Sequence, residues 1–183
     1  MESSHQLESW RDLYVMLGTS SAALLGLLFV VTSLHLDDIV NNPGYRRHAR
    51  TNSVYLIMTL VEAALILTPQ PIWSLGAEAI AINGFGLMIP TNNLYFIYKN
   101  RSSARRGGFA VYRSYVFIAS FLAGIAGGIG LAIGAEWGLY LVTAAYVSLL
   151  VSVSLNSWSI MLGVGEMDRK AKASRSAATK ERK

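Results

Sequence analysis

The Lys and Arg residues of this chain gather in every second connection between its long apolar stretches. This pattern limits the fold more than any other feature. Five apolar stretches, at about 13–36, 53–73, 75–98, 112–134 and 137–163, are each long enough to cross a bilayer as a helix. Lys and Arg gather in the first and third connections and in the tail: Arg46, Arg47 and Arg50, then Lys99, Arg101, Arg105, Arg106 and Arg113, then seven more from Arg169 to Lys183. The second and fourth connections hold none. Because basic loops stay cytoplasmic, the sequence predicts five spans with the N-terminus outside and the C-terminus in the cytoplasm.

Five spans leave little of the chain for a soluble domain. The chain has 183 residues, and each span uses about 20 of them. We therefore expect an all-α integral membrane bundle of five transmembrane helices over residues 1–165, followed by a basic cytoplasmic tail at 166–183. The excess of the formal net charge of +5 lies at the predicted cytoplasmic ends, where anionic lipid is the nearest partner. Anionic lipid of the bilayer, rather than nucleic acid, is therefore the expected partner of the basic segments.

The ends of the predicted spans carry further signals of the same orientation. Trp10, Trp73 and Trp137 all fall at the predicted outer face, where tryptophan suits the headgroup level. Residues 1–12 hold three acidic groups and one basic group, Arg11, which is the only Lys or Arg outside the basic blocks. A signal peptide would start with a positive segment, so we expect the first stretch to be retained as a span. The chain has no cysteine, which excludes a disulfide framework, a thiolate metal site and a Cys nucleophile.

Glu62 is the most informative single residue, because it lies near the middle of the second span, in TLVEAALIL. A carboxylate at bilayer depth is costly and marks a functional-site hypothesis. Desolvation disfavours the charged form, so we expect a neutral carboxyl that points into the bundle. It would either bond to a neighbouring helix or face water or a bound cation. With candidate partners at similar depth it forms a predicted intramembrane polar site of Glu62, Asn83, Thr19, Ser20 and Ser21.

Glycines in the fourth span predict close helix packing. Gly124 and Gly128 are four residues apart, as are Gly130 and Gly134. Glycines at this spacing form a groove in which another backbone can approach closely. The partner is either another span of the same chain or a second copy across an oligomer seam, so a homo-oligomer is one of the two alternatives.

The third stretch is the least apolar of the five, with Glu78, Asn83, Pro90, Asn92 and Asn93. Pro90 predicts a kink, which membranes tolerate where neighbouring helices cover the backbone. We therefore expect this helix to be the one most enclosed by protein. Asn156 of the fifth span is expected to form a second polar cluster with Asn92 and Asn93, near the inner end of the bundle.

The sequence offers little for catalysis or for binding a cofactor. His35 precedes Asp37 and Asp38, but nothing supplies a clear metal geometry, and haem ligation would need paired intramembrane histidines. Nucleophile-elbow, P-loop and HExxH patterns are absent from the sequence. We therefore expect no cofactor, no metal and no enzyme of a standard class.

One resemblance adds to this interpretation. The run from Trp10 through Leu34 holds W-RDLY-ML-GTSSAALLGLLFVVTSL, which resembles the first span of an uncharacterised family of small five-span bacterial inner-membrane proteins. The Asn156-Ser157-Trp158 element is similar to an Asn-Ala-Trp element in their last span, and RTNSVYLIMTLVEAALILTP resembles their second span. The resemblance implies a five-helix protein of the bacterial inner membrane and no catalytic residues.

Two functions of different classes fit these features. The first is an assembly or regulatory membrane protein that acts by binding other membrane proteins. The second is a small oligomeric channel or ion-translocating protein that uses Glu62. The sequence favours the first, because each of its intramembrane polar residues has an adequate explanation in helix packing.

Overall fold

The computed structural model describes residues 2–41, 43–99 and 108–158 of the chain. Its described backbone is helical and holds no strand: α1 (Glu2–Leu34), α2 (Leu36–Asn41), α3 (Pro43–Leu67), α4 (Ile72–Lys99), α6 (Gly108–Ala132) and a last helix described over Trp137–Trp158. Apart from the short α2, each contains a stretch long and apolar enough to cross a membrane. The predicted all-α fold with five such helices is confirmed, whereas the predicted tail at 166–183 lies outside the described residues.

Prolines set both ends of α3. The helix begins at Pro43, where the missing N–H costs no hydrogen bond and the fixed φ suits a first turn. It therefore starts well before 53, the predicted start of the second span, and its three arginines lie on a helix rather than in a loop. It ends at Leu67, because Pro69 and Pro71 cannot continue the backbone ladder.

A glycine turn ends α6. Gly134 has a φ of 76°, its N–H donates to Leu131 O at 3.0 Å, and the N–H of Ala135 donates to Gly130 O at 2.8 Å. This pair of bonds is a Schellman motif, with glycine in the left-handed position that other residues avoid. A Cβ on Gly134 would meet nothing within 4 Å. The structure thus corrects one prediction: Gly134 terminates the helix and packs against no other helix in the described part of the chain.

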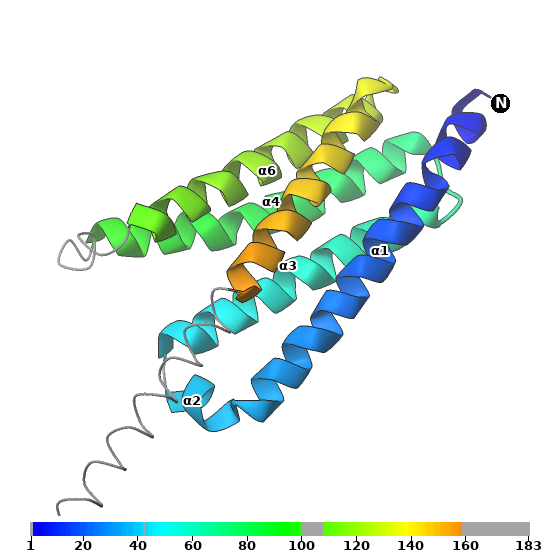
Figure 1. Ribbon diagram of the computed structural model, residues 1–183. Helices are drawn as coiled ribbons and strands as arrows, with labels where there is room; N and C mark the ends of the chain where they lie inside the picture. The colour runs from blue at the N-terminus through cyan, green and yellow to red at the C-terminus, as the bar shows by residue number, and fades with distance from the viewer. Residues whose placement is uncertain (1, 42, 100–107, 159–183) are drawn as a thin grey trace, which may run out of the picture.

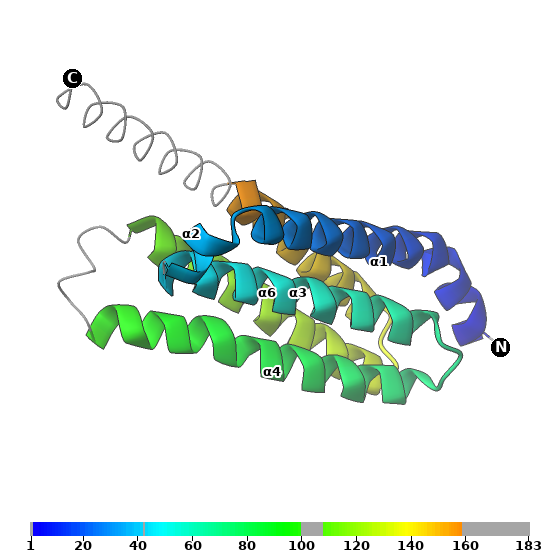
Figure 2. The same cartoon turned by 90° about the horizontal axis from the view of Figure 1, so that it is seen from below.

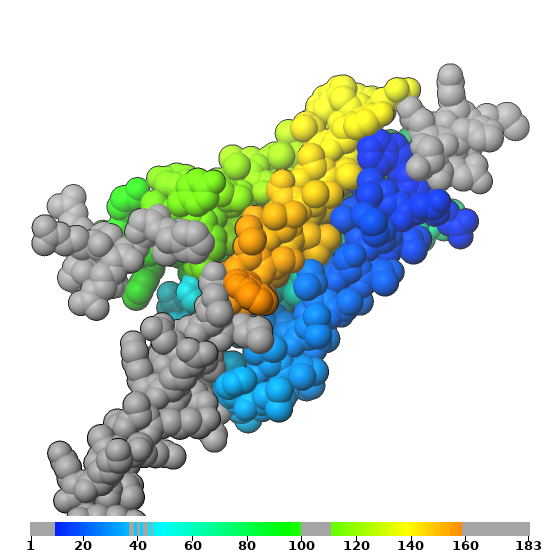
Figure 3. Space-filling view, in the orientation of Figure 1, coloured from blue at the N-terminus to red at the C-terminus, as the bar shows by residue number. Residues whose placement is uncertain are grey.

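The last helix contacts each of the other four long helices. α1 packs along α3 and α4 packs along α6, and the last helix lies between α1 and α6 on the face seen in Figures 1 and 3. Its Thr143, Tyr146 and Asn156 are hydrogen-bonded to α1, α4 and α3 respectively. Of its most apolar stretch 50% is buried, against 28% for α4. The expectation that α4 is the most enclosed helix is therefore wrong, because only one side of α4 faces the bundle while Phe85 and Met88 point outward.

Glycines bring α6 into backbone contact with its neighbours. A Cβ on Gly128 would lie 3.0 Å from Gly76 O of α4, and a Cβ on Gly130 would lie 2.9 Å from the backbone of the last helix. Gly124 faces the side chain of Asn83 on α4. These three glycines of the predicted packing face therefore contact helices of the same chain, the first of the two alternatives left open by their spacing.

Basic side chains gather at one end of the bundle. The start of α3, the end of α4 and the start of α6 lie together there, as Figures 1 and 2 show, and they carry Arg46, Arg47, Arg50, Lys99 and Arg113. The start of α1 and the turns after α3 and α6 lie at the opposite end, with Trp73 and Trp137. The two ends therefore differ in charge as the alternating basic blocks predict. The side of the membrane that each end faces stays a prediction, and Arg101, Arg105 and Arg106 lie outside the described residues.

Large apolar side chains cover much of the outer surface. Phe29 on α1 is 73% exposed and Ile133 after α6 is 72% exposed, and Leu122 and Leu155 are also exposed. Water-soluble proteins rarely show such extended apolar surface. The hydrocarbon of a bilayer is the environment in which this surface is stable.

Candidate functional site

Glu62 lies on α3 and is 2% exposed. Its side chain is hydrogen-bonded to the hydroxyl of Tyr146 on the last helix. Its second oxygen, Oε2, has no hydrogen-bond partner among the described residues. The carboxyl therefore faces the interior of the bundle rather than lipid, and one of its oxygens has an unused acceptor capacity.

Asn83 reaches Glu62 through the same tyrosine. Asn83 is fully buried on α4, and its Nδ2 donates to Ala79 O at 2.8 Å and to the Tyr146 hydroxyl at 3.1 Å. Because the tyrosine oxygen accepts from Asn83, its own hydrogen is left to donate to Glu62. Glu62, Tyr146 and Asn83 thus form a buried polar cluster, hereafter the midspan cluster, that joins three helices.

Tyr146 was not among the residues predicted from the sequence. A tyrosine in a membrane span is equally consistent with a residue of the apolar core. Only its position near the middle of the fifth span could have indicated that it is a partner for Glu62. A tyrosine hydroxyl buried at that depth needs a hydrogen-bond partner. The carboxyl and the amide at similar depth on α3 and α4 supply two.

Asn83 also explains why Gly124 is a glycine. The Oδ1 of Asn83 has no hydrogen-bond partner in the described structure, and it lies where a Cβ on Gly124 would stand. A glycine Cα–H beside a carbonyl oxygen makes a weak favourable contact. The amide of Asn83 and the missing side chain of Gly124 are therefore fitted to each other across the α4–α6 contact.

The hydroxyls of α1 do not join the midspan cluster. Ser21 is fully buried, but its Oγ donates to Leu56 O of α3 at 2.6 Å. Thr19 is exposed and donates to Val15 O of its own helix at 2.8 Å, and Ser20 is also exposed. The predicted site is corrected here: similar depth placed these residues near Glu62, but the rotation of about 100° per helical residue turns Thr19 and Ser20 away from the bundle.

A second set of polar side chains lies at the basic end. The Nδ2 of Asn156 donates to Asn52 Oδ1 at 2.6 Å, and its Oδ1 accepts from Arg113 Nη1. The Nδ2 of Asn52 donates to the Oγ of Ser157 at 3.1 Å. Asn156 was predicted to pair with Asn92 and Asn93. Asn52 and Arg113 are its partners instead, because the start of α3 is helical and brings Asn52 into the bundle.

Arg113 fixes the state of His48. The Nη2 of Arg113 lies 3.0 Å from His48 Nδ1. A guanidinium only donates hydrogen bonds, so His48 Nδ1 accepts, and the imidazole is neutral with its proton on Nε2. In the described structure the two hydrogen-bond partners of Arg113, Asn156 and His48, are both neutral, so neither balances the positive charge of its guanidinium.

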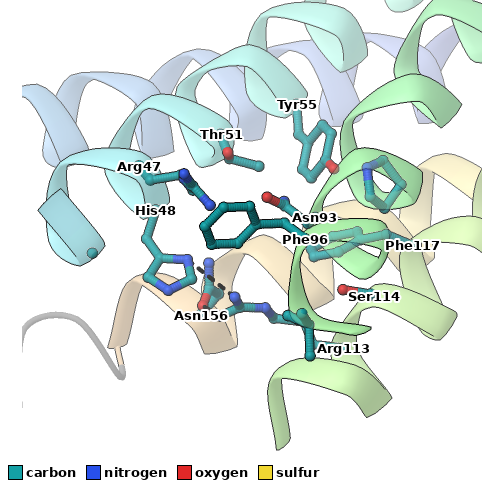
Figure 4. Close-up of a pocket in the computed structure, with 13 residues that line it drawn as sticks. Arg47, His48, Thr51, Tyr55, Asn93, Phe96, Arg113, Ser114, Phe117 and Asn156 are labelled. Atoms are coloured by element: carbon teal, nitrogen blue, oxygen red, sulfur yellow. Dashed lines mark hydrogen bonds between the residues drawn. The ribbon is translucent and has the colours of Figure 1, made fainter. Parts of the chain in front are cut away.

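A cavity of about 430 Å³ opens beside these residues between α3, α4, α6 and the last helix. Figure 4 shows Arg47, Arg113, Tyr55 and Asn93 around it. The lining residues are Gly44, Arg47, His48, Thr51, Tyr55, Pro90, Asn93, Phe96, Ile97, Arg113, Ser114, Phe117 and Asn156. Hereafter this is the basic cavity. Its polar groups come from all four helices, while Phe96 and Phe117 provide apolar walls.

Metal ligands do not gather in the part of the chain that the structure describes. It holds no group of three or more His, Asp or Glu side chains that could bind a metal ion. His35 Nδ1 lies 3.3 Å from Val31 O of its own helix, and the side chains of Asp37 and Asp38 lie outside the described set.

Comparisons with models of protein families, with curated proteins and with solved structures gave no match.

Proposed function

We propose that the protein is a multi-pass protein of a bacterial inner membrane that acts as an assembly or regulatory partner of other membrane proteins and catalyses no reaction. Its N-terminus would lie outside and its C-terminus in the cytoplasm. The orientation is supported by the collection of basic side chains at one end of the bundle, since such residues favour the cytoplasmic side.

The observation that carries this proposal is that polar side chains of four helices are hydrogen-bonded to one another inside the bundle. Glu62, Tyr146 and Asn83 bond within the midspan cluster, and the Tyr14 hydroxyl lies 2.7 Å from the Oγ1 of Thr143. These side chains tie α1, α3, α4 and the last helix together. At the depth of the membrane the outer surface of the described helices is therefore mainly apolar. Such helix surfaces can pack against the helices of other membrane proteins.

Two glycines on outer faces are suited to such contacts. A Cβ on Gly26 of α1 or on Gly84 of α4 would meet nothing within 4 Å. Among the described residues these two glycines have no close packing neighbour, unlike Gly124 and Gly128. Small residues on an open face let a second membrane helix approach closely. We propose that partner helices contact the protein at one or both of these faces.

Anionic lipid is a further proposed partner. A groove of about 760 Å³ lies between α1 and α3, with Gly26, Leu25 and Phe29 along it and Arg46 and Arg50 in its lining. The groove therefore includes the Gly26 face, and lipid would fill it where no partner helix is bound. Acyl chains suit the apolar part, and arginines near a membrane surface attract anionic headgroups.

Size analysis of mild-detergent extracts tests the proposed assembly role. The tagged chain in native membranes should migrate as a complex larger than the purified chain. Gly26→Leu or Gly84→Leu should release it to the size of the chain alone without lowering its melting temperature. Ser20→Leu, which adds bulk at another exposed position of α1, is the matched control and should keep the complex. Unchanged complexes in both glycine variants would contradict the proposed faces.

Ion flux through liposomes separates this function from the channel alternative. The midspan cluster is closed off from the exposed hydroxyls of Thr19 and Ser20, so the purified protein should give no more flux than empty vesicles. A flux that Glu62→Gln abolishes would replace the proposed role with ion translocation.

A further inference from the structure

The basic cavity carries an inference beyond the proposed binding of partner helices. Arg47 and Arg113 both line it, and none of its lining residues in the described structure is Asp or Glu. Among the described residues, Arg113 bonds only to the neutral groups of Asn156 and His48, and Arg47 lies over the ring of Phe96 with its Cζ 5.0 Å from the ring centroid. The cavity therefore holds two guanidinium charges that no acidic side chain of the described chain balances.

Tyr55 supplies an independent sign that a ligand belongs there. The residue is 1% exposed, and its hydroxyl is buried without a hydrogen-bond partner in the described structure. The ring is held by Phe117 and Phe121, at centroid distances of 4.7 and 5.4 Å, so it cannot turn its hydroxyl out to water. In Figure 4 this hydroxyl points toward Phe117, another residue that lines the cavity. A buried hydroxyl left unpaired costs free energy, and a polar ligand atom would remove that cost.

The donors match an oxyanion. Arg113 uses two of its N–H groups for Asn156 and His48, and a guanidinium has five, so three remain. Arg47 and the Tyr55 hydroxyl add donors from α3. Guanidinium groups bind phosphate with paired hydrogen bonds, and a phosphate monoester carries about two negative charges at neutral pH, the number that the two arginines balance.

The volume and the lining of the cavity limit the size and polarity of the part of the ligand beyond its phosphate. About 430 Å³ lies within the range of sites for small molecules and leaves room beyond a phosphate group. Phe96, Phe117 and Pro90 line that space and favour an apolar or aromatic body. We propose that the basic cavity binds a phosphate-bearing organic anion, whose phosphate lies between Arg47 and Arg113 and whose body lies against these rings.

Phenyl phosphate is the probe, because it joins a phosphate monoester to one ring. The full-length protein in nanodiscs of neutral phosphatidylcholine is titrated by calorimetry and by thermal shift. We expect saturable binding that weakens with salt, and no binding of uncharged benzyl alcohol. Absence of saturable phenyl phosphate binding would overturn the proposal.

Three single variants locate the site. Arg47→Gln removes an exposed charge and should weaken binding about tenfold, which corresponds to about 1.4 kcal/mol. Tyr55→Phe keeps the ring contacts and should weaken binding several-fold. Arg50→Gln is the matched control, since Arg50 lies one turn along α3 but lines the other groove, and it should leave binding unchanged. An equal loss in Arg47→Gln and Arg50→Gln would mean attraction to surface charge and would overturn the site.

A repeat in nanodiscs containing anionic phosphatidylglycerol distinguishes two sources of the phosphate. Competition by that lipid, lost in Arg47→Gln, would identify the ligand as a headgroup. Undiminished phenyl phosphate binding would identify a free organic phosphate.

Discussion

The contact between Gly124 and Asn83 predicts an unusually large effect of a single methyl group. Gly124→Ala would place its Cβ on the Oδ1 of Asn83. The amide cannot move aside cheaply, because its Nδ2 is held by Ala79 O and by the Tyr146 hydroxyl at 2.8 and 3.1 Å. Either α6 moves away from α4 or the midspan cluster breaks. Overpacking of this kind costs about 1–3 kcal/mol, and we expect the free energy of unfolding to fall by that amount.

Three further variants separate this clash from other effects of alanine. Gly84→Ala makes the same chemical change on α4 where a Cβ meets nothing within 4 Å, so its effect should stay below about 1 kcal/mol, the difference in helix propensity. Asn83→Ala should cost about 1 kcal/mol through its lost intramembrane hydrogen bond. In the double variant of Asn83 and Gly124 the new methyl group enters space that the amide has left. The loss in free energy of unfolding of the double variant should therefore be smaller than the sum of the two single losses by about 1–2 kcal/mol.

The assay is reversible unfolding of the purified protein in detergent, followed by tryptophan fluorescence. Additive costs of the two single changes would refute the argument, since they would mean that the two positions do not touch. Equal costs of Gly124→Ala and Gly84→Ala would refute it as well.

Other variants test the remaining features. Glu62→Gln should change stability little, because the amide oxygen still accepts from Tyr146, whereas Glu62→Leu should cost about 1 kcal/mol; equal melting temperatures for both would show that the bond contributes nothing. Tyr146→Phe removes the link between Asn83 and Glu62 and should cost about 1–2 kcal/mol, measured by the same unfolding assay; a cost no larger than that of Tyr140→Phe, an exposed tyrosine of the same helix, would contradict the midspan cluster. Gly134→Ala places a Cβ in a left-handed turn and should cost about 1–2 kcal/mol despite the open space there; an unchanged melting temperature would mean that the turn adopts another conformation.

The number of helices was predictable because hydropathy and length are properties of single segments. The five apolar stretches need no knowledge of their neighbours, since any span of hydrocarbon must satisfy its own backbone as a helix. The helix ends were less predictable. α3 begins at Pro43 because a helix continues past the membrane surface wherever its residues permit, whereas the apolar stretch begins only at about 53.

The partners of polar residues depend on rotation as well as on depth, and the sequence supplied only depth. Thr19, Ser20 and Ser21 lie within one turn, yet only Ser21 faces α3. Gly134 lies four residues after Gly130, the spacing expected of a packing glycine, but it is beyond the end of α6 at Ala132. The basic cavity needed four helices to be placed before Arg113 could be seen beside Arg47 and Tyr55, since Arg113 lies on α6, far along the sequence from the two α3 residues.

Labelling of single cysteines from one side of the membrane tests the central claim most directly. The chain has no cysteine, so cysteine can replace Thr68 or Glu136 at one end and Asn41 or Lys99 at the other, all exposed positions. With an impermeant thiol reagent outside intact cells, we predict labelling at Thr68 and Glu136, and labelling at Asn41 and Lys99 only after the membrane is opened. Labelling of Lys99 from outside in intact cells would contradict the five-span bundle with its basic end in the cytoplasm.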